Sequence, residues 1–240
     1  MKDDMRKRIT VDNDPLAGLI EYEDEGVLVV NKPQGMLTSS GPKDKRPTLW
    51  KTVRARAMAA GHQQQMGIIH RLDRDASGLL VFSKNDNAYQ SLKKQFFQHT
   101  VDRVYMAVVK GTPRPTAGTL KNKLTEWKNG TVHPAQKGGE EAITYYETCE
   151  VFSGCSLVRV KLETGRKHQI RVHMAGIGCP IVGDAFYNPD AKEDDKLMLC
   201  AVKLCFDHPL TGQRMKFEVD LPAPMREAIR NAKARVGKGG

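Results

Sequence analysis

The stretch GIIHRLDRDASGLLVFSKN, residues 67–85, restricts the possible folds of this chain more than any other part of the sequence. Its centre, HRLDRD at residues 70–75, carries five ionisable side chains in six positions. Ile68 and Ile69 precede this run, and the apolar segment Leu79–Phe82 follows it. Segments this apolar are normally buried, so the fold has to hold a charged loop between two buried segments. Carboxylates and arginines held in this way indicate a chemical task.

The composition is that of an ordinary globular protein. A chain of 240 residues, of which 40% are hydrophobic and 28% charged, can bury one sizeable core or two small ones. No apolar run approaches the length of a membrane span, and the N-terminus MKDDMRKRITVDND lacks the apolar core of a signal peptide. The five cysteines are odd in number and contain no CxxC pair, so we expect reduced thiols in a cytoplasmic protein.

The charge balance points to a polyanionic partner. There are 38 lysines and arginines against 28 acidic residues, a formal net charge of +10. A basic surface can serve solubility alone. It can also bind nucleic acid, because lysines and arginines that meet phosphates release condensed counterions.

Hydrophobic patterning predicts strands with mostly short connections and a few helices. The expected strands are 26–31, 78–83, 103–109, 142–151, 156–163, 197–206 and 215–219. The expected helices are 50–60, 86–98 and 225–235, with Asp86 as the N-cap of the second and Ala88, Leu92 and Phe96 on its apolar face. Residues 38–45 are expected to form a mobile loop. This pattern predicts a single α+β domain at 16–224, preceded by a flexible segment at 1–15 and followed by a basic helix and tail at 225–240.

A second unusual stretch is LETGRKHQIRVHMAGIGCPIVGDAFY, residues 162–187. Ile170, Met174 and Ile177 form a helical apolar stripe, and Gly178 is expected at the C′ position of that helix. Arg166 stands at the start of the helix, where a simple polar face would also carry basic residues. Arg171 lies between Ile170 and Val172, a less comfortable place for a solvated side chain.

Several kinds of chemistry lack their motif. His168 and His173 do not have the i, i+4 spacing that places two metal ligands on one helical face, so we expect no metal site. There is no P-loop, no GxGxxG after a strand and no GxSxG elbow, so we expect no nucleotide cofactor and no serine nucleophile of that type. What remains is a carboxylate flanked by arginines, without a cofactor.

Four motifs together resemble the RluA family of RNA pseudouridine synthases. They are NKPQG at 31–35, HRLDRDASGLL at 70–80, RVYMAVVKG at 103–111 and ETGRKHQIRVHMAGIGCPIVGDAFY at 163–187. The resemblance runs from about residue 22 to residue 222, and one departure is Ala76, where the family usually has threonine. It implies a single catalytic domain with a mixed, largely antiparallel central sheet flanked by helices and an active-site cleft. Because few residues precede the motifs, we expect no additional N-terminal RNA-binding domain.

The resemblance also implies roles for individual residues. Asp73 corresponds to the catalytic aspartate, which can act as a nucleophile or as a base. Tyr105 corresponds to the active-site tyrosine that packs on uracil, with a core position as the alternative. Arg171 corresponds to the arginine that pairs with the catalytic carboxylate. Ile170 is expected to line the uracil pocket, or simply to pack in the core.

Other residues of these motifs are candidates for binding RNA. Arg71 is expected to enter the space left by a flipped uridine, with an ion pair to Asp73 or Asp75 as the alternative. For the remaining candidates the alternative is support of a loop or turn, or a solvated position: His70, Arg74, Lys32 and Arg166.

The sequence therefore predicts a monomeric, cofactor-independent enzyme that isomerises uridine in ribosomal or transfer RNA and has no DNA or membrane partner. One alternative is an RNA-binding protein of the same fold without activity, although Asp73, Tyr105 and Arg171 are all present. Another is a glycosidase, which needs two carboxylates across the bond, and only Asp75 is close in sequence to Asp73.

Overall fold

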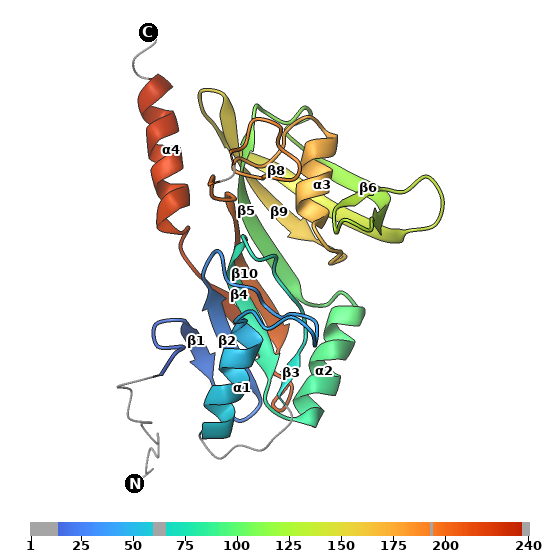
Figure 1. The fold of residues 1–240 in the computed structure, drawn as a ribbon, viewed down its shortest axis with the longest axis vertical. Coiled ribbons are helices and arrows are strands. Elements are labelled where there is room, and N and C mark those ends of the chain that lie inside the picture. Colours follow the sequence, from blue (N-terminus) through green and yellow to red (C-terminus); the bar gives the residue numbers. More distant parts are fainter. Residues whose placement is uncertain (1–13, 60–65, 193, 237–240) are drawn as a thin grey trace.

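The computed structural model describes residues 14–59, 66–192 and 194–236, and the predicted flexible segment at 1–15 and the end of the tail lie almost entirely outside this part. The described strands form one sheet in the order β1-β2-β4-β10-β5-β9-β8-β6-β7, with β3 pairing with β4 and β11 with β10 (Figure 1). Every named pairing is antiparallel except that of β4 with β10. The mixed, largely antiparallel α+β fold is confirmed.

The strands are β1 (Ile20–Glu23), β2 (Val27–Lys32), β3 (Gly67–Ile68), β4 (Ser77–Ser83), β5 (Asp102–Lys110), β6 (Ala117–Glu126), β7 (Val132–Pro134), β8 (Glu140–Val151), β9 (Cys155–Leu162), β10 (Leu199–Asp207) and β11 (Arg214–Glu218). The helices are α1 (Leu49–Ala59), α2 (Asp86–Phe97), α3 (Gln169–Gly176) and α4 (Ala223–Val236).

Strand β4 is the centre of the core, and all seven of its residues are buried. Leu80 and Phe82 join an apolar cluster that also contains residues of α1 and α3. Leu79 and Val81 join a second cluster, which contains Leu92 of α2. Apolar contacts on both sides explain the uninterrupted hydrophobic run of this strand. The charged stretch that precedes it is thereby attached to the most buried element of the molecule.

The sequence predicted the apolar strands well and missed four others. β6, whose sequence is AGTLKNKLTE, alternates between exposed and partly exposed residues until Leu124 and is held by its pairing with β8. β1, β3 and β7 have only two to four residues each. The N-cap of α2 is Asn85 and not Asp86, because the Asn85 side chain accepts a hydrogen bond from the Ala88 N–H. Gly178 follows α3 with φ +74°, as its predicted C′ position requires.

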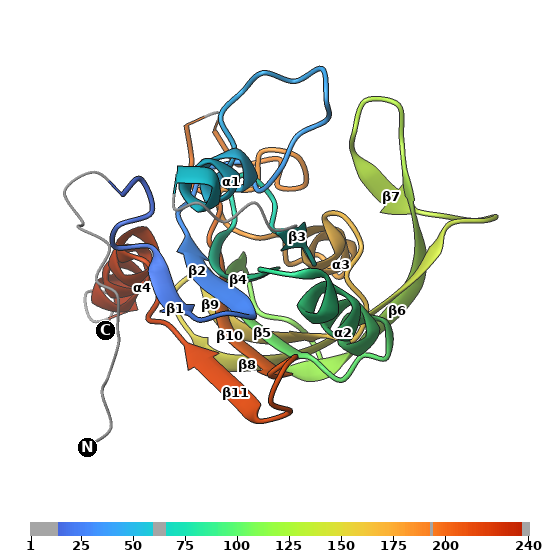
Figure 2. The same cartoon turned by 90° about the horizontal axis from the view of Figure 1, so that it is seen from below.

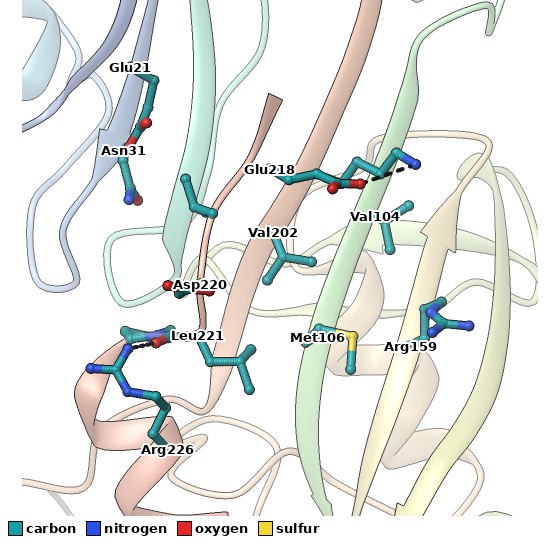
Figure 3. A pocket seen from close by; sticks show the side chains of 13 residues that line it. Glu21, Asn31, Val104, Met106, Arg159, Val202, Glu218, Asp220, Leu221 and Arg226 are labelled. Atoms are coloured by element: carbon teal, nitrogen blue, oxygen red, sulfur yellow. Dashed lines mark hydrogen bonds and ion pairs between the residues drawn. The ribbon is translucent and has the colours of Figure 1, made fainter. Parts of the chain in front are cut away.

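The two faces of β5 have different surroundings. Tyr105 belongs to the cluster that contains residues of α1 and α3, whereas Val104 and Met106 point to the other face. There they line an open hollow of about 1060 Å³ together with Val202, Leu221 and several charged side chains (Figure 3). Of residues 70–75 and α3, none contributes to the lining described for this hollow. Leu72, Tyr105 and Ile170 belong instead to the cluster on the opposite face, which also contains residues of α1 and α3. Both helices are seen in Figure 2.

Candidate active site

Asp73 lies in a loop between β3 and β4 that is anchored on both sides of the aspartate. On one side, the Thr38 hydroxyl donates to the Leu72 carbonyl at 2.8 Å and accepts from the Leu72 N–H at 3.2 Å. On the other side, the Lys32 ammonium donates to the Arg74 carbonyl at 3.0 Å. Thr38 is 2% exposed, so the segment predicted to be a mobile loop begins with a buried anchor. The carboxylate between these anchors keeps 23% of its side-chain surface exposed and can be reached from solvent.

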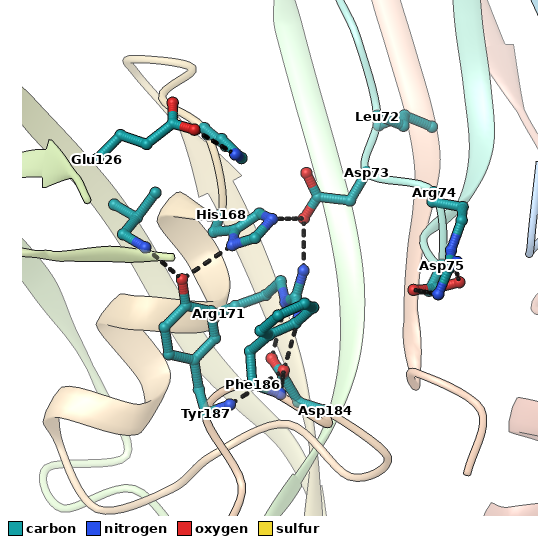
Figure 4. Close-up of polar contacts among 12 residues, drawn as sticks. Leu72, Asp73, Arg74, Asp75, Glu126, His168, Arg171, Asp184, Phe186 and Tyr187 are labelled. Carbon is teal, nitrogen blue, oxygen red and sulfur yellow. Dashed lines mark hydrogen bonds and ion pairs between the residues drawn. The ribbon is translucent and has the colours of Figure 1, made fainter. Parts of the chain in front are cut away.

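Arg171 reaches the same carboxylate from α3. Its Nη1 lies 3.2 Å from Oδ2 of Asp73, and the two residues are 98 positions apart in the sequence (Figure 4). Its Nε and Nη2 donate to the two oxygens of Asp184 at 2.8 and 2.7 Å. Burial alone would lower the pKa of Arg171, but the bonds to Asp184 and the charge of Asp73 raise it overall. A permanent positive charge is therefore held against Asp73, as the resemblance implied.

Asp184 anchors both Arg171 and the segment that follows it. Its side chain is fully buried, and its Oδ1 also accepts hydrogen bonds from the N–H groups of Phe186 and Tyr187. A buried carboxylate is tolerated when it is paired with a cation and hydrogen-bonded in this way. Asp184 therefore fixes the guanidinium of Arg171 and the backbone of the following segment at once.

Two aromatic residues of that segment surround the guanidinium. The rings of Phe186 and Tyr187 both lie 5.2 Å from the central carbon of Arg171. The Tyr187 hydroxyl is 2.8 Å from Nδ1 of His168, and Nε2 of the same imidazole is 4.0 Å from Oδ2 of Asp73. Sequence reasoning singled out neither Tyr187 nor His168 for this site.

Tyr105 of β5 and Ile170 of α3 are both buried, and they belong to the same hydrophobic cluster. Tyr105 is 6% exposed and Ile170 is 5% exposed, and both pack with Leu72, the neighbour of Asp73. Burial raises the pKa of Tyr105, although the charge of Arg103 opposes the rise, so the hydroxyl stays protonated at neutral pH. The two side chains form an apolar floor close to the charged loop.

Three predicted RNA-binding arginines lie on the surface. Arg71 is exposed, Arg74 forms a salt bridge with Asp75 at 2.9 Å, and Arg166 forms one with Glu140 at 2.6 Å. The Asp75 carboxylate therefore turns toward Arg74 and away from Asp73 (Figure 4). This geometry does not place a second carboxylate opposite Asp73, as a glycosidase would need.

Lys32 and His70 are turned inward. The Lys32 side chain is fully buried, and its ammonium donates to the carbonyls of Pro33, Met36 and Arg74. Burial lowers the pKa of Lys32 to about 8, while the charges of Asp75 and Asp73 oppose the shift. His70 accepts a hydrogen bond from the Val81 N–H at 3.2 Å and stacks on Phe96 of α2. Both residues brace the charged loop in this structure.

The burial of His70 predicts a loss of stability in acid. Burial, with the charge of Arg103, lowers the pKa of His70 to about 3, whereas an unfolded histidine has a pKa near 6.5. Between these values the unfolded chain binds the additional proton, so the free energy of unfolding falls as the pH falls below 6.5. Between pH 7 and pH 5 we expect a loss of about 2 kcal/mol from this residue.

Denaturant unfolding of the wild type and of His70→Gln at both pH values measures this loss. Glutamine keeps an acceptor for Val81 but does not titrate, so the variant should show a smaller difference between pH 7 and pH 5. If the free energy of unfolding changed equally between pH 7 and pH 5 in the two proteins, His70 would not be the cause of the loss in acid.

Among the residues that the structure describes, no group of three His, Cys, Asp or Glu side chains is placed to hold a metal ion. No helix in the same part of the chain has the length and apolar character needed to cross a bilayer. The site consists of one reachable carboxylate, a buried cation and an apolar floor. Such an arrangement can attack an electrophilic carbon or remove a proton.

Comparisons with known proteins identify the family of this chain. The sequence profile of the RNA pseudouridylate synthase family matches residues 26–176. The "uncharacterized RNA pseudouridine synthase YlyB" of Bacillus subtilis is 41% identical over 217 residues, which cover 88% of this chain and 72% of that protein. Ribosomal large subunit pseudouridine synthase D of Pseudomonas aeruginosa is 36% identical over 222 residues, which cover 85% of this chain and 68% of that protein.

The fold agrees with these relationships. The structure of human RNA pseudouridylate synthase domain containing 4 superimposes with a TM-score of 0.75, covering 90% of this chain and 94% of the human one at 22% identity. The chain belongs to the RluA family of RNA pseudouridine synthases, which are isomerases that act on RNA.

Proposed function

We propose that this enzyme converts specific uridines of ribosomal or transfer RNA to pseudouridine, with Asp73 as the catalytic residue. The observation that carries this assignment is the reachable Asp73 carboxylate, held by the buried cation of Arg171. Two relatives are named ribosomal large subunit pseudouridine synthase D, from Pseudomonas aeruginosa and Zymomonas mobilis, and their names favour ribosomal RNA. In this proposal the enzyme acts as a monomer in the cytoplasm and does not use DNA.

The proposed reaction moves one bond. The bond between N1 of uracil and C1′ of ribose breaks, the base turns and a bond from C5 to C1′ forms. C5 loses its proton and N1 gains one, so the product is an isomer of the substrate. Asp73 acts on the sugar or ring as a nucleophile, or on a sugar proton as a base. Tyr105 and Ile170 supply the apolar surface on which uracil packs, and Arg171 holds its positive charge against Asp73. A purely RNA-binding role does not require a partly exposed carboxylate that is paired with a buried arginine.

Pseudouridine mapping tests the assignment. Large-subunit ribosomal RNA and transfer RNA are compared between cells with and without the gene. We expect specific pseudouridines to disappear from ribosomal RNA without the gene and to return with the wild-type gene but not with Asp73→Asn. If no position in either RNA responds to the gene, the proposed substrates are wrong.

Arg71 is proposed to fill the space that the flipped uridine leaves. Its side chain is exposed, while Asp73 pairs with Arg171 and Asp75 pairs with Arg74. Among the described residues no salt bridge joins Arg71 to either aspartate, so the structure favours contact with RNA over an internal brace. Unstacking a uridine costs a few kcal/mol, which a planar guanidinium can offset by stacking on the neighbouring bases.

Arg71→Ala should therefore slow the reaction on a structured RNA at least about tenfold more than on a short, unstructured RNA with the same uridine. Single-turnover rates on the two RNAs measure this ratio, and melting temperatures check the fold. Arg159→Ala is the control, because it removes an exposed arginine that lines the hollow on the opposite face of the sheet. Equal slowing on both RNAs would rule out the insertion of Arg71 into the stack.

A further inference from the structure

The two oxygens of the Asp73 carboxylate have different surroundings. Oδ2 lies 3.2 Å from Nη1 of Arg171 and 4.0 Å from Nε2 of His168. The contacts of the described residues include none for Oδ1, which points away from both partners (Figure 4). One oxygen is thus held by the protein, and the other is available to a substrate.

The backbone places the imidazole of His168 beside this carboxylate. His168 is the N-cap of α3 and adopts the left-handed conformation, with φ 52° and ψ 15°. A left-handed residue other than glycine is uncommon, and such conformations cluster at functional sites. The His168 side chain is 10% exposed, so its hydrogen-bond partners come mainly from the protein.

Tyr187 fixes which nitrogen of that imidazole carries the proton. The Tyr187 oxygen accepts a hydrogen bond from the Val132 N–H at 2.8 Å, and the same hydroxyl is 2.8 Å from Nδ1 of His168. The Tyr187 oxygen already accepts the Val132 N–H, and its own proton needs an acceptor. Nδ1 of His168 is in position to accept it. A neutral imidazole that accepts at Nδ1 carries its own proton on Nε2, the nitrogen that faces Oδ2 of Asp73.

The neutral form fits the surroundings of His168. Burial lowers its pKa, while the negative charges of Asp73 and Asp184 oppose this and the positive charges of Arg171 and Lys167 support it. The present separation of 4.0 Å is longer than a hydrogen bond. Such contacts in a free enzyme often shorten when substrate binds.

We propose that His168, held as its Nε2–H tautomer by Tyr187, is a positioning residue that secures Oδ2 of Asp73 together with Arg171 and leaves Oδ1 to react. This inference rests on the proposed function, because it assigns the reacting oxygen of the same carboxylate. His168 and Tyr187 act through Asp73 and need not touch the RNA.

A double-mutant cycle tests the proposal. The variants are Tyr187→Phe, His168→Asn and their combination, and asparagine is chosen because it tolerates the left-handed backbone. Tyr145→Phe is the matched control, since its hydroxyl bonds Glu163 and its side chain is exposed. The substrate is transcribed large-subunit ribosomal RNA with tritium at C5 of uridine, and tritium release under single turnover gives the rate constant and the half-saturating enzyme concentration.

We expect Tyr187→Phe and His168→Asn each to lower the saturated rate constant by about 10- to 100-fold, with half-saturation unchanged within about twofold. The combined variant should be no slower than His168→Asn alone, because the tyrosine acts through the histidine. Tyr145→Phe should match the wild type. Melting curves check the fold, and His168→Gln takes the place of His168→Asn if the latter is unstable.

Three results would overturn the proposal: an unchanged rate in Tyr187→Phe, a change in half-saturation alone, or a further slowing by Tyr187→Phe in the His168→Asn background. The last result would mean that the Tyr187 hydroxyl affects the rate through its bond to Val132 in the β6–β7 hairpin, and not through His168. Asp73→Asn separates this failure from that of the proposed function. Turnover by Asp73→Asn would refute the assignment of Asp73 itself, whereas an inactive Asp73→Asn with multiplicative effects at 168 and 187 would refute only the role of His168.

Discussion

Asp73→Asn should abolish pseudouridine formation while leaving RNA affinity within a few-fold of the wild type. The substitution removes the charge of the reacting oxygen and changes little of its shape. Arg171 keeps its two bonds to Asp184 in the variant, so the site should not collapse. Loss of a general base costs about 10²–10⁴ in rate, and loss of a nucleophile removes the covalent route. Digestion of reacted RNA and quantification of pseudouridine measure the loss, and filter binding measures the affinity.

Asp75→Asn is the matched control for this experiment. It removes a carboxylate two positions further along the same loop, where the side chain is 34% exposed and pairs with Arg74. Such an exposed pair contributes little to stability. We expect the control to retain most of the activity. Substantial turnover by Asp73→Asn, or equal loss in the two variants, would contradict the assignment of Asp73.

Arg171→Met should lower both activity and stability. The substitution leaves Asp184 fully buried without its cation, and removing one partner of a buried pair costs about 3–5 kcal/mol. For a protein of this size the melting temperature should fall on the order of 10 °C. Asp73 loses its nearest positive charge at the same time, so the rate at saturating RNA should fall as well. Thermal unfolding and single-turnover kinetics measure the two effects.

Combining Arg171→Met with Asp184→Asn separates these effects. The asparagine can still accept hydrogen bonds from the Phe186 and Tyr187 N–H groups and no longer carries a buried charge. The double variant should therefore recover part of the lost melting temperature without recovering activity. Recovery of activity would mean that Arg171 serves Asp184 alone and has no function at Asp73.

The elements that could be predicted were those whose own hydrophobic pattern shows which of their residues are buried. The apolar runs of β2 and β4 indicate strands without further context, and so does the alternation in β5. β6 was not predictable in this way, because its residues are mostly exposed and its pairing with β8 holds it in place. The observed N-cap of α2, Asn85, is one residue before the predicted one. Asn85 and Asp86 are both favourable N-cap residues, and the backbone geometry selects between them.

The site was predictable only through resemblance to a family. Nothing in the spacing of Asp73 and Arg171 brings together residues 98 positions apart, and the motifs alone indicated their pairing. The burial of Lys32 was not predictable from the sequence, because a lysine next to a turn is normally a surface residue. Its burial depends on three carbonyl groups that converge only after the charged loop and the turn at 33–36 have packed together. The contacts of His168 and Tyr187 depend on tertiary packing in the same way.

The burial of Lys32 makes this amine a natural reporter of loop opening. The burial that lowers the pKa of Lys32 to about 8 also keeps reagents away from this side chain, which has no exposed surface. Acylating reagents should therefore modify exposed lysines such as Lys121 and Lys128 quickly and spare Lys32 in the closed protein. Acylation of Lys32 can occur only during moments when the loop carrying Asp73 separates from the turn. The labelling rate at this one position thus measures how often the catalytic loop opens, and no residue has to be substituted.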